Sequence, residues 1–142
     1  MLAEGIVDWK SGSNQICLNS TVVRPNDLYH GVGSLYYDWD NSEIDKNGNM
    51  TVPTYDVPME ESDFVLLNDQ FIGTVFEKMY NMLSSNYKLG RVRLMRSLPK
   101  TCLSWHEDTS PRVHYPIKTR EGCLMVIEDE VKHLGQDKWW YT

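Results

Sequence analysis

The chain has 142 residues, of which 41% are hydrophobic and 24% are charged, and this composition is typical of a globular protein rather than a disordered one. Its length suffices for one hydrophobic core, and we expect residues 1–142 to form a single domain. Lys and Arg total 14 against 20 Asp and Glu, a net charge of −6, which argues against a non-specific nucleic-acid binder because such proteins need a basic surface.

Several features predict a cytoplasmic protein that does not contact membranes. No apolar run approaches the ~20 residues of a membrane span. Residues 1–10 include Glu4 and Asp8 and lack the apolar centre of a signal peptide, so we expect no secretory signal. The three cysteines form no Cys-x-x-Cys pair, which argues against a structural zinc site or a disulfide framework.

The first part of the chain, residues 1–67, is predicted to be irregular with short strands. It is rich in turn formers, including Asn47 and Gly48 within an acidic stretch. Pro53 and Pro58 prevent a continuous helix in the residues that follow. We therefore expect loops and turns here rather than a long regular element.

The clearest helix is predicted over residues 68–86. Apolar side chains recur at steps of three and four positions across Phe71–Leu83, which is typical of an amphipathic helix with one buried face. Asn68 or Asp69 can cap its start. We expect this helix to pack on a sheet formed mainly from residues 90–142.

After Gly90 the period of the pattern changes from about four residues to two, which indicates strands. The runs are short and are separated by prolines and glycines, so they favour an α+β, mainly β, fold built as a sandwich or barrel rather than βαβ units. The predicted strand segments are Val92–Ser97, Cys102–Trp105, Arg112–Ile117, Cys123–Ile127 and Trp139–Tyr141.

Two pairs of residues in this half of the chain suggest chemistry. His106 and Asp108 are two positions apart, so on a strand their side chains share a face and can reach one metal ion. Two histidines and one carboxylate on one face of a metal leave three positions open, an arrangement that suits non-haem Fe(II) and oxygen chemistry. The alternative is a structural histidine hydrogen-bonded to a nearby acid. Arg112 and His114 are spaced in the same way and can hold a carboxylate together.

The segment resembles the aspartyl/asparaginyl β-hydroxylase-like branch of the 2-oxoglutarate/Fe(II)-dependent oxygenases. That family's pattern is His-x-Asp, a short turn, and Arg-x-His-x-Pro, with an aliphatic residue and a Thr soon after. The resemblance covers roughly residues 94–141. The matching residues are His106, Asp108, Arg112, His114, Pro116, Ile117 and Thr119.

This resemblance implies a double-stranded β-helix, a cupin-like jelly roll, with at least one flanking helix. It implies Fe(II) held by His106 and Asp108, and 2-oxoglutarate held partly by Arg112 and His114. With O2, the reaction would hydroxylate an amino acid, a peptide or a small metabolite while the cosubstrate is oxidatively decarboxylated.

The chain departs from the family pattern at the third metal ligand. The family uses a distal His on a later strand, usually followed by an Arg, whereas here only His133 lies downstream and no Arg follows Arg120. His133 is a weak candidate for the third ligand because it stands in a loop-like stretch, and His30 is a weaker candidate still. The aromatic ending, residues 138–142, indicates a β-helix core over 90–142 that stops before the distal His. An open sheet edge of this kind favours a homodimer.

Three functions remain open from the sequence. The first is an oxygenase-like hydroxylase that is inactive unless a distal His is supplied. The second is a non-catalytic jelly-roll module that binds a partner or a small acid, and the third is a metal-binding cupin with other chemistry, such as isomerisation. A complete third ligand and a distal Arg would distinguish the first function from the other two.

Overall fold

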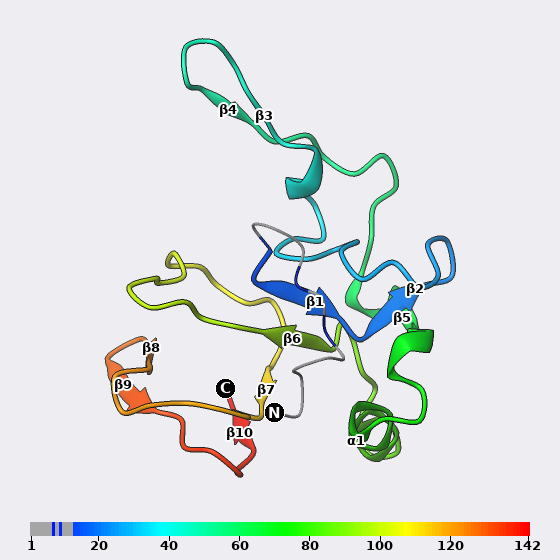
Figure 1. The fold of residues 1–142 in the computed structure, drawn as a ribbon, viewed down its shortest axis with the longest axis vertical. Coiled ribbons are helices and arrows are strands. Elements are labelled where there is room, and N and C mark those ends of the chain that lie inside the picture. The colour runs from blue at the N-terminus through cyan, green and yellow to red at the C-terminus, as the bar shows by residue number, and fades with distance from the viewer. Residues whose placement is uncertain (1–6, 8, 10–12) are drawn as a thin grey trace. The chain divides into compact units, whose positions relative to one another are not determined.

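The computed structural model describes residues 7, 9 and 13–142. The chain divides into two compact units, Met1–Thr101 (unit 1) and Cys102–Thr142 (unit 2). Both contain short antiparallel strand pairs, and unit 1 holds the single α-helix of the described residues (Figure 1). The predicted mixed fold with mostly short strands is confirmed, and the described residues form no closed barrel.

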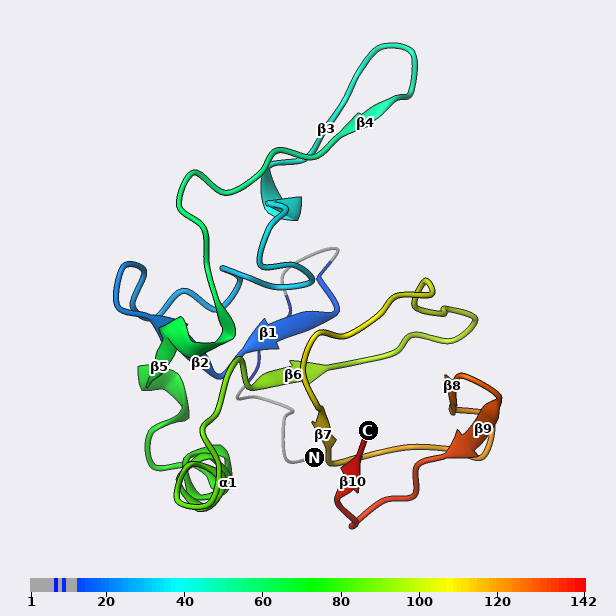
Figure 2. The same cartoon turned by 180° about the vertical axis from the view of Figure 1, so that it is seen from behind.

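Two antiparallel strand pairs form the centre of unit 1 (Figure 1, Figure 2). The pairs are β1 (Gln15–Cys17) with β6 (Arg93–Met95), and β2 (Asn19–Thr21) with β5 (Phe64–Leu67). Leu18 joins them, because its N–H donates to the Val92 carbonyl at 2.7 Å and its own carbonyl accepts from the Asn68 N–H at 2.8 Å. All residues of the segment 16–21 are buried, so this segment is central rather than an edge.

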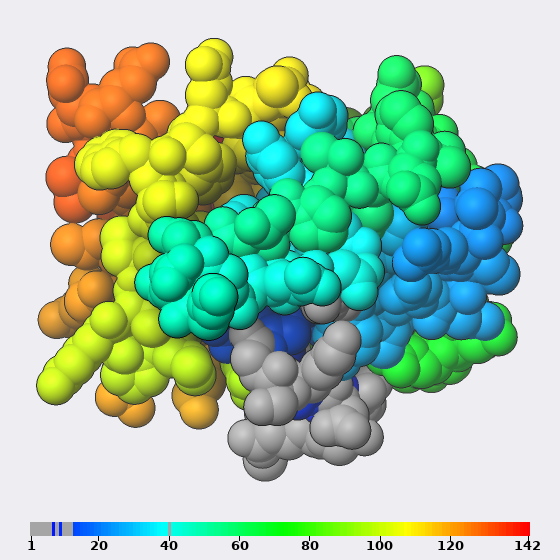
Figure 3. Space-filling model, turned by 90° about the horizontal axis from the view of Figure 1, so that it is seen from above, coloured from blue at the N-terminus to red at the C-terminus, as the bar shows by residue number. Residues whose placement is uncertain are grey.

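A long irregular excursion separates β2 from β5, as predicted for residues 1–67. It contains the hairpin of β3 (Glu43–Ile44) and β4 (Met50–Thr51), whose strands are exposed and face the viewer in Figure 3. The Asp45 carboxylate accepts from the backbone N–H groups of Asn47 at 2.8 Å and Asn49 at 2.9 Å, and Gly48 takes a φ of +84°. Short 3-10 turns occur at η1 (Trp39–Asn41) and η2 (Glu61–Asp63).

The helix predicted over 68–86 is confirmed in its centre, where α1 spans Val75–Ser84. Its predicted start is wrong, because Asp69–Phe71 forms the 3-10 turn η3 and Gly73, with a φ of +79°, departs from helical geometry. Thr74 then caps α1, since its side chain accepts a hydrogen bond from the Phe76 N–H at 3.2 Å.

The hydrophobic core of unit 1 is built from residues that precede Gly90. Phe71 and Phe76 meet edge to face with their ring centroids 5.7 Å apart, so α1 packs on η3. No described residue beyond position 90 is buried, so the expectation of a core sheet formed mainly from 90–142 is wrong. The large side chains that are almost fully buried are Ile16, Phe64, Phe71 and Phe76.

The Asn19 side chain holds three segments of unit 1 together. Its amide nitrogen donates to the carbonyls of Phe64 at 2.6 Å and Gly90 at 2.9 Å. Its amide oxygen accepts from the Val92 N–H at 2.8 Å. Asn19 is 0% exposed, so its amide satisfies its own donor and acceptor groups through these three hydrogen bonds.

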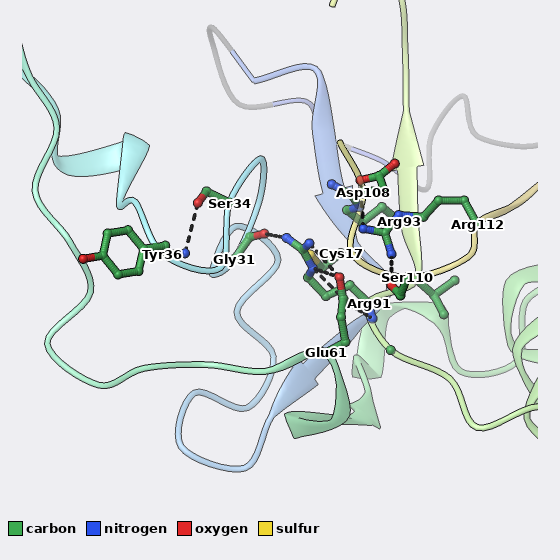
Figure 4. Close-up of polar contacts among 12 residues, drawn as sticks. Cys17, Gly31, Ser34, Tyr36, Glu61, Arg91, Arg93, Asp108, Ser110 and Arg112 are labelled. Carbon is green, nitrogen blue, oxygen red and sulfur yellow. Dashed lines mark hydrogen bonds and ion pairs between the residues drawn. The ribbon is translucent and has the colours of Figure 1, made fainter. Parts of the chain in front are cut away.

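Beside this amide lies a largely buried ion pair (Figure 4). The Arg91 side chain is 6% exposed and contacts both oxygens of Glu61, with Nη2 at 2.8 Å from Oε1 and Nε at 3.1 Å from Oε2. Its Nη1 donates to the Gly31 carbonyl at 2.5 Å. Gly31 has a φ of +79°, and a Cβ there would lie 2.7 Å from the Phe64 ring, so only glycine fits.

Unit 2 consists of two strand pairs joined by irregular segments. β7 (Val113–His114) pairs with β10 (Trp140–Tyr141), and β8 (Leu124–Ile127) pairs with β9 (Glu130–His133). The strand predicted at Cys102–Trp105 is not formed. No helix in the described part of either unit has the length and apolar character that a membrane crossing requires.

Replacing Asn19 by Ala should destabilise unit 1 by about 3 kcal/mol, because the buried side chain would lose three hydrogen bonds, two to carbonyls and one from an N–H. Urea denaturation of the wild type and Asn19→Ala measures the difference. Asn81→Ala on the exposed surface of α1 is the control and should change stability by no more than about 0.5 kcal/mol. Equal midpoints for all three proteins would contradict the role of this amide.

The cysteines should differ in reactivity toward iodoacetamide. Burial raises the pKa of the Cys17 thiol to about 11, although Arg93 and Arg91 oppose the shift, and the thiolate is the reactive form. Cys102 and Cys123 are exposed. At pH 8, mass spectrometry should find both exposed cysteines alkylated and Cys17 unmodified until denaturant is added. Labelling of Cys17 at the rate of the other two would show that the segment 16–21 is not buried.

Candidate functional site

The predicted site residues lie on an irregular turn in unit 2 rather than on a strand. The described backbone has no strand between residue 96 and β7, so the shared strand face expected for His106 and Asp108 is not formed. Their side chains nevertheless approach each other, with Nε2 of His106 at 3.9 Å from Oδ1 of Asp108. His106 and Asp108 are therefore close on a turn, whereas the prediction placed them on one face of a strand.

The orientation of the His106 ring is set by a local hydrogen bond. Its Nδ1 lies 2.8 Å from the Ser104 carbonyl oxygen, and because a carbonyl can only accept, Nδ1 carries the proton in this contact. In the neutral ring, Nε2 then bears the lone pair and faces Asp108. Histidines that ligate metals are commonly held in this way, with the second nitrogen bound to a backbone carbonyl.

The Asp108 carboxylate is also bound by Arg112 (Figure 4). Nη2 of Arg112 lies 3.0 Å from Oδ1, the same oxygen that lies 3.9 Å from Nε2 of His106. Nη1 of Arg112 donates to the Ser110 hydroxyl at 2.6 Å. The carboxylate thus lies between an imidazole and a guanidinium, both of which come from within four residues of it in the chain.

Arg112 and His114 are positioned by the β7–β10 ladder. The Arg112 backbone exchanges two hydrogen bonds of 2.9 Å with Thr142, which extends the pairing beyond the bounds of the two strands. Nε2 of His114 lies 3.1 Å from the Thr142 hydroxyl. The structure therefore brings Arg112 to Asp108 and His114 to Thr142.

The two histidines considered as a third ligand have other surroundings. His133 lies at the end of β9 rather than in a loop, which corrects the prediction, and its Nδ1 is 3.2 Å from the Cys123 carbonyl oxygen. His30 belongs to unit 1, where its ring packs edge to face on Tyr55 at 4.9 Å. Across residues 7, 9 and 13–142, no group of three or more His, Cys, Asp or Glu side chains is arranged to hold a metal ion.

The His106–Asp108 pair would have to come closer together to ligate one divalent ion. Donor atoms at about 2.1 Å from a metal lie about 3.0 Å apart at adjacent octahedral positions, and the observed separation is 3.9 Å. Imidazole nitrogen and carboxylate oxygen are both ligands of Fe(II). The pair supplies two donors, and the same carboxylate oxygen contacts Arg112.

The residues that support the site were not predicted from the sequence. The Ser104 carbonyl orients His106, the Ser110 hydroxyl holds Arg112, and the Thr142 side chain contacts His114. The spacing of Ser110, two positions before Arg112, could have indicated the second contact. Nothing in the sequence indicates the Thr142 contact, because it depends on the pairing of β7 with β10.

Comparison with protein-family models, with curated proteins and with solved structures finds no match to this chain. The resemblance to the oxygenase family therefore stays a prediction.

The His30 imidazole should make unit 1 sensitive to acid. Burial, aided by Arg24, lowers the pKa of His30 below 6.5, so the folded state binds fewer protons than the unfolded state as the pH falls through 6.5. The free energy of unfolding should therefore decrease over this range. His30→Phe keeps a ring against Tyr55 and cannot titrate, so its stability should fall less between pH 7.5 and 5.5 in urea titrations. Parallel curves for the two proteins would contradict this role.

Proposed function

We propose that the chain is a 2-oxoglutarate/Fe(II)-dependent oxygenase-like protein whose metal site includes His106 and Asp108. The observation that carries this proposal is the orientation of the His106 ring. The Ser104 carbonyl holds Nδ1, so that Nε2 faces the Asp108 carboxylate at 3.9 Å, and a small rotation of the exposed Asp108 side chain would bring the two donors to one ion.

Arg112 supports the same proposal on the cosubstrate side, and His114 is the proposed second contact. Arg112 is fixed by Ser110 and by the ladder to Thr142, and its Nη2 donates to the Asp108 carboxylate as it would to a cosubstrate carboxylate. When bound, Fe(II) and 2-oxoglutarate supply the oxygen chemistry of hydroxylation. The antiparallel pairs β7–β10 and β8–β9 are compatible with a double-stranded β-helix, which is part of the proposal, as is a substrate that is an amino acid, a peptide or a small metabolite.

A site with two protein ligands should bind metal weakly, because each missing donor loosens the coordination geometry. We expect residues 1–142 to bind Fe(II) poorly and to convert 2-oxoglutarate to succinate slowly or not at all. A longer form of the chain that supplies a third ligand should bind the ion more tightly.

The test measures Co(II) binding by calorimetry and succinate release with Fe(II), ascorbate and 2-oxoglutarate. His106→Ala and Asp108→Ala should each lower the Co(II) affinity at least about tenfold, since each removes a ligand. Asp129→Ala removes an exposed acid from the β8–β9 turn and should leave the affinity unchanged. His133→Ala should also leave it unchanged, and a large loss there would make His133 the third ligand. Equal Co(II) affinities for the wild type, His106→Ala and Asp108→Ala would contradict the metal site.

The Arg112–Asp108 ion pair favours a second candidate, a non-catalytic binding module. A carboxylate that is permanently paired with Arg112 would stabilise the turn and would have no metal to bind. Such a module could pair with a second copy through β8 or β9, which form a two-stranded sheet with exposed Leu124 and Val131. A wild type that binds no Co(II) and forms a dimer in ultracentrifugation would support this candidate over the oxygenase.

A further inference from the structure

We propose that unit 1 carries a binding site for a neutral monosaccharide, in a polar pocket whose lining includes the Asp38 carboxylate, the Asn41 amide and the His30 imidazole. This site lies wholly within unit 1 and is independent of the function proposed for His106 and Asp108, which belong to unit 2. Its test therefore needs neither a metal ion nor 2-oxoglutarate.

The pocket lies between the turn of residues 24–30 and two paired segments at the base of the β3–β4 hairpin. In this pairing the Asp38 N–H donates to the Pro53 carbonyl at 2.8 Å, and the Tyr55 N–H donates to the Tyr36 carbonyl at 3.1 Å. The pocket volume is about 230 Å³, below the ~300–1,000 Å³ of pockets for drug-sized ligands, so the pocket suits one small ring. Its lining includes the polar side chains of Arg24, Asp27, His30, Asp38, Asn41 and Tyr55.

The Asp38 carboxylate and the Asn41 amide present an acceptor and a donor next to each other. Nδ2 of Asn41 donates to Oδ2 of Asp38 at 2.6 Å, which orients both planar groups. Oδ1 of Asp38 then remains as an acceptor, and the second Nδ2 hydrogen of Asn41 remains as a donor. Each hydroxyl of a sugar ring can donate and accept, so a carboxylate beside an amide can bind two neighbouring hydroxyls of one ring.

The charge balance of the lining favours a neutral ligand. Oδ2 of Asp27 lies 3.8 Å from Nη1 of Arg24, so these two charges offset each other. Oδ1 of Asp27 accepts from the backbone N–H groups of Tyr29 and His30, both at 3.0 Å. Burial, aided by Arg24, lowers the pKa of His30 below 6.5, so its ring is neutral at pH 7.5. Asp38 remains as a negative charge that opposes a phosphate or another dense anion, and an apolar ligand would desolvate these polar groups without replacing their hydrogen bonds.

Exposed aromatic rings adjoin this polar lining along the chain. Tyr37 and Trp39 flank Asp38, and their ring centroids lie 6.4 Å apart. Tyr37 is 46% exposed and Trp39 is 50% exposed. Because the C–H face of a sugar ring packs well on aromatic rings, these side chains offer a second contact to a sugar that belongs to a longer glycan.

The first test is calorimetric titration of the chain with glucose, galactose, mannose and N-acetylglucosamine. One of them should bind with a dissociation constant of about 1 mM, because a few hydrogen bonds in a small pocket contribute modestly to affinity. Asp38→Ala should lower this affinity at least about tenfold, and Asp38→Asn, which keeps the size of the side chain, should lower it about threefold. Asp56→Ala removes an exposed acid of unit 1 that does not line the pocket, and this matched control should leave the affinity unchanged. Equal urea midpoints establish that the variants are folded.

The second test locates the bound sugar by NMR. The C–H resonances of the His30 ring should shift saturably with the dissociation constant found by calorimetry, because His30 lines the pocket. The resonances of His133, in β9 of unit 2, are the internal control and should not shift. A spectrum of His30→Phe assigns the His30 signals.

The outcomes decide both the site and the class of ligand. Binding of a neutral sugar that Asp38→Ala loses and Asp56→Ala retains, together with the His30 shift, supports the proposal. The proposal is overturned if none of the four sugars binds at about 50 mM, or if Asp38→Ala binds the sugar as well as the wild type does. Saturable binding of glycine in place of the sugars would make the pocket a site for a zwitterion and would overturn the proposed ligand. None of these results depends on Co(II) binding, so this site and the proposed function can fail separately.

Discussion

The buried amide of Asn19 is the constraint on which unit 1 depends. One side chain satisfies the carbonyls of Phe64 and Gly90 and the N–H of Val92, and these groups belong to segments far apart in the sequence. Because a buried backbone group without a partner is strongly destabilising, this pattern allows one relative placement of β2, β5 and the start of β6. Gly90 and Val92, on either side of Arg91, both bond to Asn19, and Arg91 between them reaches Glu61. The apolar core fills the space that this polar framework defines.

Unit 2 has no comparable constraint. None of its described residues is buried, and its strands form two separate two-stranded sheets, an arrangement that is marginally stable alone in water. The candidate site is therefore held by short-range contacts, such as those from Ser104 to His106 and from Ser110 to Arg112. A ligand that binds only the ordered turn would stabilise the unit by mass action, so the proposed metal binding would be coupled to folding of this region.

The parts of the fold that the sequence predicts are those set by local chemistry. The centre of α1 follows from its apolar period, and the β3–β4 turn follows from Asn47 and Gly48. The helix start was misplaced because the positive φ of Gly73 overrides the apolar pattern that continues back to Phe71. The core was misplaced because it depends on the long-range pairing of β2 with β5, which no local pattern shows. In the site, the sequence predicts that His106 approaches Asp108 but places both on a strand. They lie instead on a turn that side-chain hydrogen bonds stabilise.

The charge pattern of the site places one carboxylate between two nitrogen groups. Asp108 and Arg112 are four residues apart and oppositely charged, and Nη2 of Arg112 lies 3.0 Å from Oδ1 of Asp108. Under the proposed function, an ion at His106 and Asp108 would approach this oxygen beside a guanidinium, and two cations so close to each other repel. The proposed metal binding is therefore opposed by the same ion pair that holds the turn in this structure.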